Sequence, residues 1–257
     1  MKKNIKLPAP QLSQLKEVNI DLDMKGRHYA EIATSEGHLP EEVAKSILDD
    51  LMDEDANLLT VNELRYLFML VKINSLENNY KVTVTCTHTL KDGTTCGHEN
   101  VKDIKLSDAD LKYTRKNYKP PVIKFAVDDS GDKEWIVLPP TVDIECALLN
   151  WIMNEKSMKI EEILTDGKIS FEYTLLRSIC HLVDSKTNER YIKGVNEFTE
   201  LYDKILDINK YSRIHELYRD VDEVSEYGIT SKAYTIECEE CGGKLSFHIP
   251  LLDGLSY

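Results

Sequence analysis

The residues of this sequence with the clearest chemical potential are four cysteines, which occur as two widely separated pairs. Cys86 and Cys96 lie in the segment TCTHTLKDGTTCGH, and Cys238 and Cys241 lie in the segment ECEECGG. Glycine directly follows the second cysteine of each pair. Structural zinc sites hold thiolates about 2.3 Å from the metal, in turns that aim backbone N–H groups at the sulfur atoms. Such a turn often forces the residue after the second cysteine to positive φ, which glycine tolerates without strain.

Alternating apolar and polar residues flank both pairs, so each pair is expected at the tip of a β-hairpin. Two such tips that face each other form a zinc ribbon. We therefore predict one shared zinc site with the ligands Cys86, Cys96, Cys238 and Cys241, and no other cofactor. A site closed by four thiolates has no open coordination position, so the prediction is of a structural site and not a catalytic one.

Other interpretations of these thiols stay open. The four cysteines could be unmetallated, and His88 or His98 could replace one thiolate as a ligand. The C-x-x-C pair could also be a redox centre. The redox interpretation is disfavoured because the pair is expected in a hairpin, whereas a lowered thiol pKa usually arises at a helix N-terminus.

The other residues with reactive side chains show no catalytic pattern. Cys146 and Cys180 lie in apolar stripes with helical spacing and are predicted to be core residues. His181 follows Cys180, but adjacent residues of a helix point about 100° apart and do not face each other. No phosphate-binding loop, nucleophile elbow or H-E-x-x-H motif occurs. We therefore predict a protein that is not an enzyme and takes no small-molecule substrate.

Composition narrows the class of protein further. The 257-residue chain has a formal net charge of −13, which argues against a protein that binds nucleic-acid phosphates. Its densest basic run, residues 112–119, is predicted to be a solvated loop. No secretory signal and no apolar run of membrane-spanning length is present, so no membrane association is expected. Six cysteines in such a chain indicate a reducing compartment.

The spacing of apolar residues predicts the elements that must position the cysteines. Residues 18–23 alternate as a short strand does, and residues 25–27 are expected to turn. A helix is predicted between Pro40 and Met52, and a capping box from Thr60 to Glu63 opens a second helix that extends to Ser75. After this helix, apolar residues recur at every second position, as in a β-strand. Strands are predicted at 81–86, 101–106, 122–127 and 134–138, the last two as a hairpin.

The chain returns to helical spacing from residue 142 to about 224, with one stripe that ends at Leu182. These patterns predict an α+β fold in four parts. Residues 1–78 form a mostly helical N-terminal segment, and 79–141 form a small antiparallel β section with the first zinc knuckle. Residues 142–228 form an inserted helical lobe. Residues 229–257 form a C-terminal β-hairpin with the second knuckle, which packs on 79–141 and completes a split zinc ribbon.

The order of these features resembles a known family. The segments that carry the resemblance are NELRYLFMLVKINS at 62–75, the Pro139-Pro-Thr141 step, EFTELYD at 197–203 and IECEECGGKLSFHIPLLD at 236–253. From about residue 40 onwards, the chain resembles the baseplate hub assembly proteins, or chaperones, of T-even-like tailed bacteriophages. This chain departs from that family in having an extra N-terminal stretch.

The resemblance implies a non-enzymatic phage protein that builds the hub of the tail baseplate or forms part of it. Its partners would be other phage baseplate and tail proteins. It would be found in the host cytoplasm during assembly or in the virion tail. Two alternatives follow from the cysteines: a zinc-ribbon nucleic-acid-binding protein of the transcription-factor type, which would need a basic face, and a thiol-dependent enzyme, which would need a reactive cysteine.

Overall fold

The computed structural model describes residues 2–9, 12–35, 38–75, 79–105, 107, 111–113, 118–192, 194, 198, 200–225, 229–231 and 233–248. They form a mixed fold of helices and small antiparallel sheets. The helices are α1 (Gly26–Ala33), α2 (Pro40–Leu51), the 3-10 turn η1 (Ala56–Leu58), α3 (Val61–Ser75), α4 (Val142–Lys156), α5 (Ile160–Thr165), α6 (Gly167–Cys180), α7 (Leu201–Ile208) and α8 (Tyr211–Ser225). The strands are β1 (Lys3–Lys6), β2 (Glu17–Ile20), β3 (Asn79–Thr85), β4 (Glu99–Lys105), β5 (Leu111–Tyr113), β6 (Val122–Phe125), β7 (Lys133–Val137), β8 (Leu182–Asp184), β9 (Ile229–Ser231), β10 (Ala233–Glu237) and β11 (Lys244–His248).

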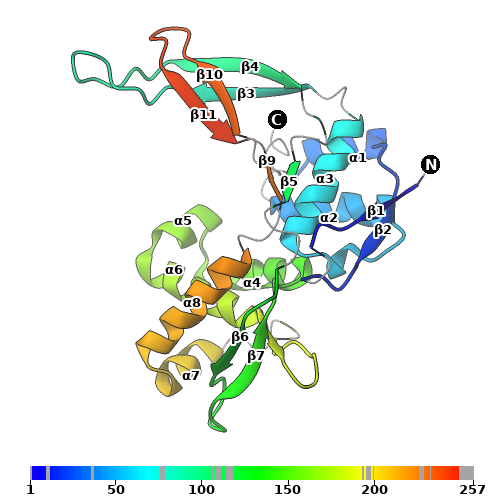
Figure 1. The fold of residues 1–257 in the computed structure, drawn as a ribbon, viewed down its shortest axis with the longest axis vertical. Coiled ribbons are helices and arrows are strands. Elements are labelled where there is room, and N and C mark those ends of the chain that lie inside the picture. The colour runs from blue at the N-terminus through cyan, green and yellow to red at the C-terminus, as the bar shows by residue number, and fades with distance from the viewer. Residues whose placement is uncertain are drawn as a thin grey trace.

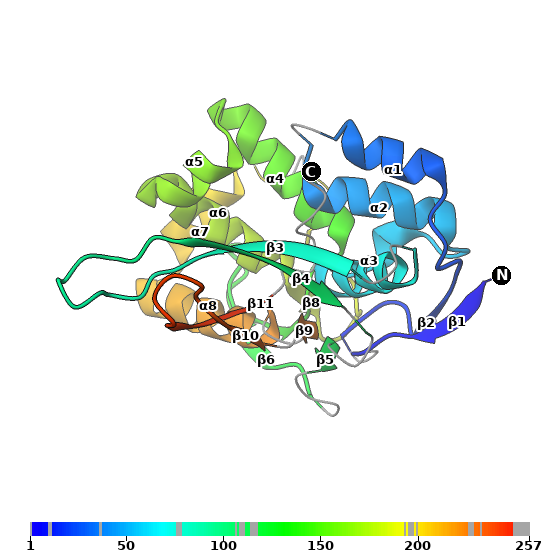
Figure 2. The same ribbon diagram turned by 90° about the horizontal axis from the view of Figure 1, so that it is seen from above.

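Three groups of elements are visible in Figure 1. Helices α1 to α3 with β1 and β2 form one group, and α4 to α8 with β6 and β7 form a second. The hairpins β3–β4 and β10–β11 lie side by side in a layer set apart from the helices, as Figure 1 and Figure 2 both show. The first hairpin precedes the second helical group in the chain and the other follows it, so this layer joins distant parts of the sequence.

The N-terminal group is built around α2 and α3. The predicted capping box at the start of α3 is confirmed: Thr60 N–H donates to Glu63 Oε2 at 2.9 Å, and Glu63 N–H donates to Thr60 Oγ1 at 3.3 Å. The predicted turn at residues 25–27 is wrong, because α1 begins at Gly26. This helix is capped by its own third residue, since Lys25 N–H donates to His28 Nδ1 at 3.0 Å.

A second hydrophobic core lies between the sheet β6–β7–β8 and helices α4, α6, α7 and α8. The predicted hairpin is confirmed, with Ile123 opposite Trp135. The prediction that the helical stripe continues to Leu182 is wrong. Helix α6 ends at Cys180, and Leu182 lies in β8, opposite Val137. A short buried strand is apolar on both faces, so its periodicity cannot be told from that of a buried helix.

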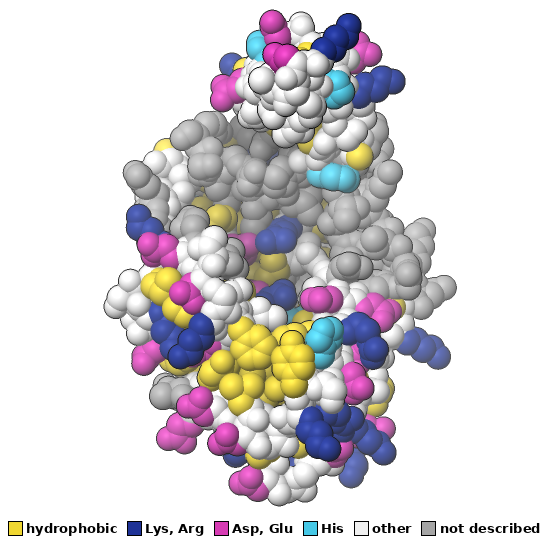
Figure 3. All heavy atoms as spheres, turned by 90° about the vertical axis from the view of Figure 1, so that its left-hand side faces the viewer, with side chains coloured by type: hydrophobic (Ala, Val, Ile, Leu, Met, Phe, Trp, Pro, Cys, Tyr) yellow, Lys and Arg dark blue, Asp and Glu magenta, His cyan; other side chains and the backbone are white. Residues whose placement is uncertain are grey.

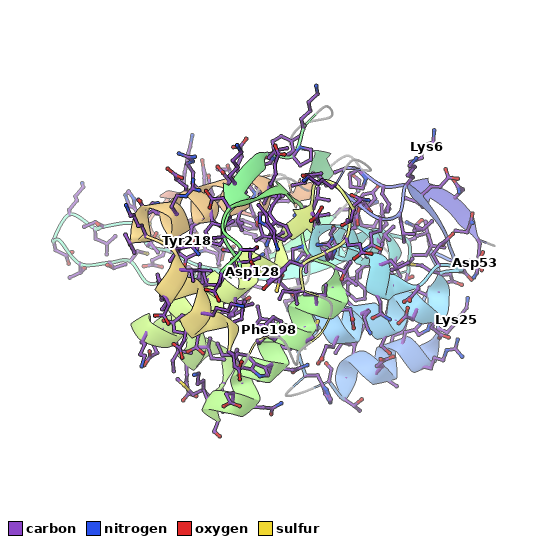
Figure 4. The ribbon with its side chains drawn as sticks, turned by 90° about the horizontal axis from the view of Figure 1, so that it is seen from below. Lys6, Lys25, Asp53, Asp128, Phe198 and Tyr218 are labelled. Atoms are coloured by element: carbon purple, nitrogen blue, oxygen red, sulfur yellow. The ribbon has the colours of Figure 1, made fainter. Side chains whose placement is uncertain are left out.

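The two helical groups are neighbours, and α4 of the second group contacts α2 and α3 of the first. In Figure 4, Tyr218 lies toward one side of the molecule, and Lys6, Lys25 and Asp53 lie toward the other. Phe198 is 1% exposed, and its ring centroid lies 5.5 Å from that of Trp151. The two groups also share apolar contacts, because Val142 of α4 packs in the core of the first group and Leu39 packs with Cys146 and Leu149 of α4.

Two short strands pair across a long stretch of sequence. In the antiparallel pair β5–β9, Lys112 is opposite Thr230. The interpretation of residues 112–119 as a solvated loop is therefore wrong for its first two residues. A pairing between segments this far apart leaves no local signal in either of them.

The β layer contacts the helices through α3. Met69 and Ile73 of that helix pack against Ile104 of β4, Tyr234 of β10 and Phe247 of β11. Since both hairpins contribute to this contact, α3 fixes where the layer lies relative to the first helical group. Within the described ranges, no helix combines the length and the apolar character needed to cross a bilayer.

Candidate metal centre

The four predicted ligands come together in the β layer. The sulfur atoms of Cys86, Cys96, Cys238 and Cys241 all lie within 4.8 Å of one another. The Sγ atoms of Cys86 and Cys241 are 3.7 Å apart, and those of Cys96 and Cys238 are 3.9 Å apart. Four thiolates placed tetrahedrally at the usual zinc–sulfur distance lie about 3.8 Å from one another. The cluster therefore has the size that one tetrahedral metal ion needs.

The first pair lies where β3 passes into β4. Cys86 N–H donates to His98 O at 2.8 Å, and Cys96 N–H donates to His88 O at 2.9 Å. Gly97, at φ +67°, donates its N–H to Cys86 O at 2.9 Å. The predicted need for a glycine at positive φ is confirmed here. An L-residue with a side chain rarely adopts this backbone conformation.

The long spacing of the first pair has a local cause. The residues between the cysteines fold into their own tight turn, in which Leu90 N–H donates to Thr94 O at 2.8 Å and Gly93 N–H donates to Leu90 O at 3.0 Å. Asp92 Oδ1 accepts the Thr94 N–H at 3.0 Å. This loop projects beyond the helices in Figure 2. The residues between the two cysteines therefore extend away from the sulfur cluster, and Cys86 and Cys96 lie together at the base of this loop.

The second pair repeats the same geometry at the tip of β10–β11. Cys238 N–H donates to Gly243 O at 2.9 Å, and Gly242 N–H donates to Cys238 O at 2.9 Å. Gly242 has φ +69°, close to the value at the first tip. In both knuckles, then, the glycine after the second cysteine hydrogen-bonds the carbonyl of the first. The two tips have the same local fold despite their different lengths.

The surroundings of the sulfur atoms are largely apolar. Cys86 and Cys238 are buried, and Cys96 and Cys241 are half-buried. The four pack with side chains that come from both hairpins: Val84, Ile236 and Leu245. Among the described residues, the group of possible ligands contains the four cysteines and neither of the candidate histidines, His88 and His98.

Electrostatics in the cluster favour a cation. The backbone N–H groups of Cys241 and Glu240 and the Asn100 amide lower the pKa of the Cys238 thiol to about 6, against the effect of burial. The His88 N–H lowers the pKa of Cys86, but burial and the neighbouring sulfur atoms outweigh it and raise that pKa to about 12. Thiols this close cannot all ionise unless a positive charge lies among them. A divalent metal ion held by the four sulfur atoms would supply that charge.

Residues that the sequence did not single out hold the two knuckles together. The buried Asn100 side chain of β4 accepts the Glu239 N–H at 2.9 Å. Lys102, also on β4, pairs with the Glu239 carboxylate at 2.5 Å. A side chain at Gly243 would meet the His88 ring, since a Cβ there would lie 2.9 Å from His88 Cγ. None of these contacts was predicted, because Asn100 precedes the strand expected at 101–106 and its burial is visible only in the structure.

The remaining thiols and the buried imidazole lie elsewhere. Cys146 and Cys180 are 6% and 1% exposed, as predicted for core residues, and burial raises the pKa of Cys146 to about 12. His181 is fully buried at the end of α6, where its Nδ1–H donates to Arg177 O at 2.9 Å. Ser225 Oγ lies 3.3 Å from the other ring nitrogen, and burial lowers the pKa of His181 to about 3. The imidazole is therefore held neutral within the fold.

The fold and the thiol cluster define a mixed helix–sheet protein whose distant segments meet at a group of residues able to hold a metal. Residues 23–255 match the family model described as T4 bacteriophage base plate protein. The match spans most of the chain, so the chain belongs to this family of T4-like phage baseplate proteins. Membership makes it a structural protein of a phage tail and implies contact with other tail proteins. No curated protein and no solved structure shows significant similarity to it.

Proposed function

We propose that this chain acts in the assembly or structure of the baseplate hub, without catalysis, through contacts with other baseplate and tail proteins. The observation that carries the proposal is the family match over residues 23–255. The resemblance of individual segments to hub assembly proteins narrows the proposal from the baseplate to its hub. The protein would act in the host cytoplasm while the hub is built.

The cysteine cluster is proposed to be a structural zinc site. Sulfur–sulfur distances near those of a tetrahedral site support this, as do the two matching glycine turns. In this proposal, residues 79–141 and 229–257 form a split zinc ribbon, and residues 142–228 are an insertion between its halves. The metal then closes a very long loop, so its binding free energy contributes directly to folding.

One partly exposed surface, formed by half-buried Phe171, Tyr202 and Tyr218 beside exposed Tyr211, has the composition that protein interfaces favour. Rings of Phe171 and Tyr202 lie 6.4 Å apart between centroids, and those of Phe171 and Tyr218 lie 6.0 Å apart. Tyr211, 69% exposed, contacts the ring of His215 close by on α8. Figure 3 shows apolar side chains gathered on this side of the molecule, beside a histidine. Tyrosine is enriched among the residues that dominate binding energy. This aromatic surface supports a role in binding another baseplate protein.

A metal assay combined with co-purification from infected cells tests the proposal. We expect one zinc per chain in the purified wild type, loss of that zinc in Cys238→Ser, and retention in the control Cys146→Ala. Tagged protein should co-purify with baseplate proteins identified by mass spectrometry, and Tyr211→Ala should reduce that recovery. Absence of metal from the wild type would refute the zinc site. Recovery of no tail protein would refute the assembly role.

A further inference from the structure

Asn100 is the one fully buried polar side chain at the described metal centre that is not a proposed ligand. It lies in β4 opposite Val84, and none of its surface is exposed. Its Oδ1 accepts the Glu239 N–H at 2.9 Å. Because only the amide oxygen can accept from a backbone N–H, this bond fixes the orientation of the side chain. The amide nitrogen is thereby directed to the Cys238 sulfur, 3.6 Å away.

The same amide is anchored to its own hairpin. Asn100 Nδ2 lies 3.3 Å from Val84 O and 3.2 Å from His98 O, both in the first hairpin. One side chain thus contacts the backbone beside the first knuckle, the backbone of the second knuckle and one of the four sulfur atoms. A second polar contact to the second knuckle is the Lys102–Glu239 ion pair, which is exposed and does not involve sulfur. Exposed ion pairs of this kind contribute little to stability.

We propose that Asn100 is a positioning residue of the metal centre, which holds the second knuckle on the first and donates an N–H···S hydrogen bond to the Cys238 thiolate. The inference rests on the proposed zinc site. Four thiolates on one divalent ion leave excess negative charge in a partly buried place. An N–H donor disperses part of that charge and holds the sulfur in the direction that the metal requires. Loss of such a partner typically weakens metal affinity by about 10–100-fold.

The test compares wild type with Asn100→Ala and with the control Lys102→Met, which removes the ion pair but leaves the sulfur bond. Zinc release to a chromogenic chelator should be about 10–100-fold faster in Asn100→Ala, the range set by partners of metal ligands. In the cobalt-substituted protein, the sulfur-to-cobalt charge-transfer bands should move to lower energy, because loss of the hydrogen bond raises the energy of the sulfur lone pairs. Lys102→Met should leave the band positions unchanged.

A purely structural role for Asn100 would change stability without moving the cobalt bands. Bands and release rates equal to those of wild type in Asn100→Ala would therefore overturn the proposal, while normal metal content in wild type would leave the zinc site intact. A wild type that takes up neither zinc nor cobalt would instead refute the metal site itself. If Asn100→Ala does not fold, Asn100→Asp serves, since it keeps the acceptor for Glu239 N–H but removes the donor to sulfur. It should show the same band shift, and unshifted bands would overturn the inference.

Discussion

The capping carboxylate of α3 should make the protein less stable as the pH rises. Glu63 is 3% exposed and accepts the Thr60 N–H at 2.9 Å. Burial raises the pKa of this carboxyl from 4.5 to about 7, because the hydrogen bond to Thr60 offsets only part of the desolvation. Between those two pH values the folded state holds a proton that the unfolded state has lost. Stability therefore falls with rising pH in this window, the reverse of the usual carboxylate case.

The size of the effect follows from the shift in pKa. Each unit corresponds to about 1.4 kcal/mol, so ionised Glu63 costs the folded state about 3 kcal/mol above pH 7. Most of that cost, about 2–3 kcal/mol, should develop between pH 5 and pH 8. Glu63→Gln keeps an oxygen that accepts the Thr60 N–H but cannot ionise. We expect the variant to be the more stable protein at pH 8 and nearly equal to wild type at pH 5.

The assay is urea unfolding followed by circular dichroism at several pH values from 5 to 8. Glu155→Gln, on the exposed side of α4, serves as the matched control and should follow wild type throughout. Taking the difference between Glu63→Gln and wild type at each pH removes the contribution of the cysteine cluster, which is common to both. Parallel pH profiles for Glu63→Gln and wild type would refute the reasoning, because they would mean that Glu63 titrates alike in the folded and unfolded chains.

Three further predictions concern packing and the metal. Gly243→Ala should weaken zinc binding, because its Cβ would lie 2.9 Å from His88 Cγ. The double variant Gly243→Ala/His88→Ala should recover the zinc affinity, and competition with a chelator measures the affinity of both variants. If the double variant does not recover, the His88 contact is not the cause. Phe198→Ala should lower the free energy of unfolding by about 3–5 kcal/mol, since the ring is 1% exposed; a loss under 1 kcal/mol in urea titrations would contradict the packing seen around it. Chelation of the metal should abolish hydrogen-exchange protection in β10–β11 and leave it in α3 and α6, whereas uniform loss would mean that the layer and the helices unfold together.

Local chemistry explains which parts of the fold could be predicted from the sequence. The capping box at Thr60 and the β6–β7 hairpin each depend on a few adjacent residues, so their patterns sufficed. The cysteine pairs were also visible because glycine after the second cysteine marks a backbone conformation. Their meeting in space was inferred from chemistry: four thiolates suit one metal ion.

The parts that could not be predicted depend on distant contacts. Strand β8 is specified by its pairing with β7, and β5 by its pairing with β9, so neither has a signal in its own segment. Helix α1 begins at a glycine and takes its cap from His28 inside the helix, so no standard start signal precedes it. The role of Asn100 depends on Glu239 and Cys238, which lie beside it only in the folded chain. In each case the structure depends on a residue that is distant in the sequence or, for α1, on a cap that comes from inside the helix.

Within the described residues, the β layer has few buried apolar side chains of its own. The apolar interiors of the two helical groups share no residue with the cluster around the sulfur atoms, which contains Cys86, Cys238 and Leu245 as its buried members. An isolated two-stranded hairpin is marginally stable in water, and the layer consists of two. Its contact with α3 adds only a small second cluster. A zinc ion bound at the proposed site would supply what the layer lacks in buried apolar surface, at the place where the chain returns from the second helical group.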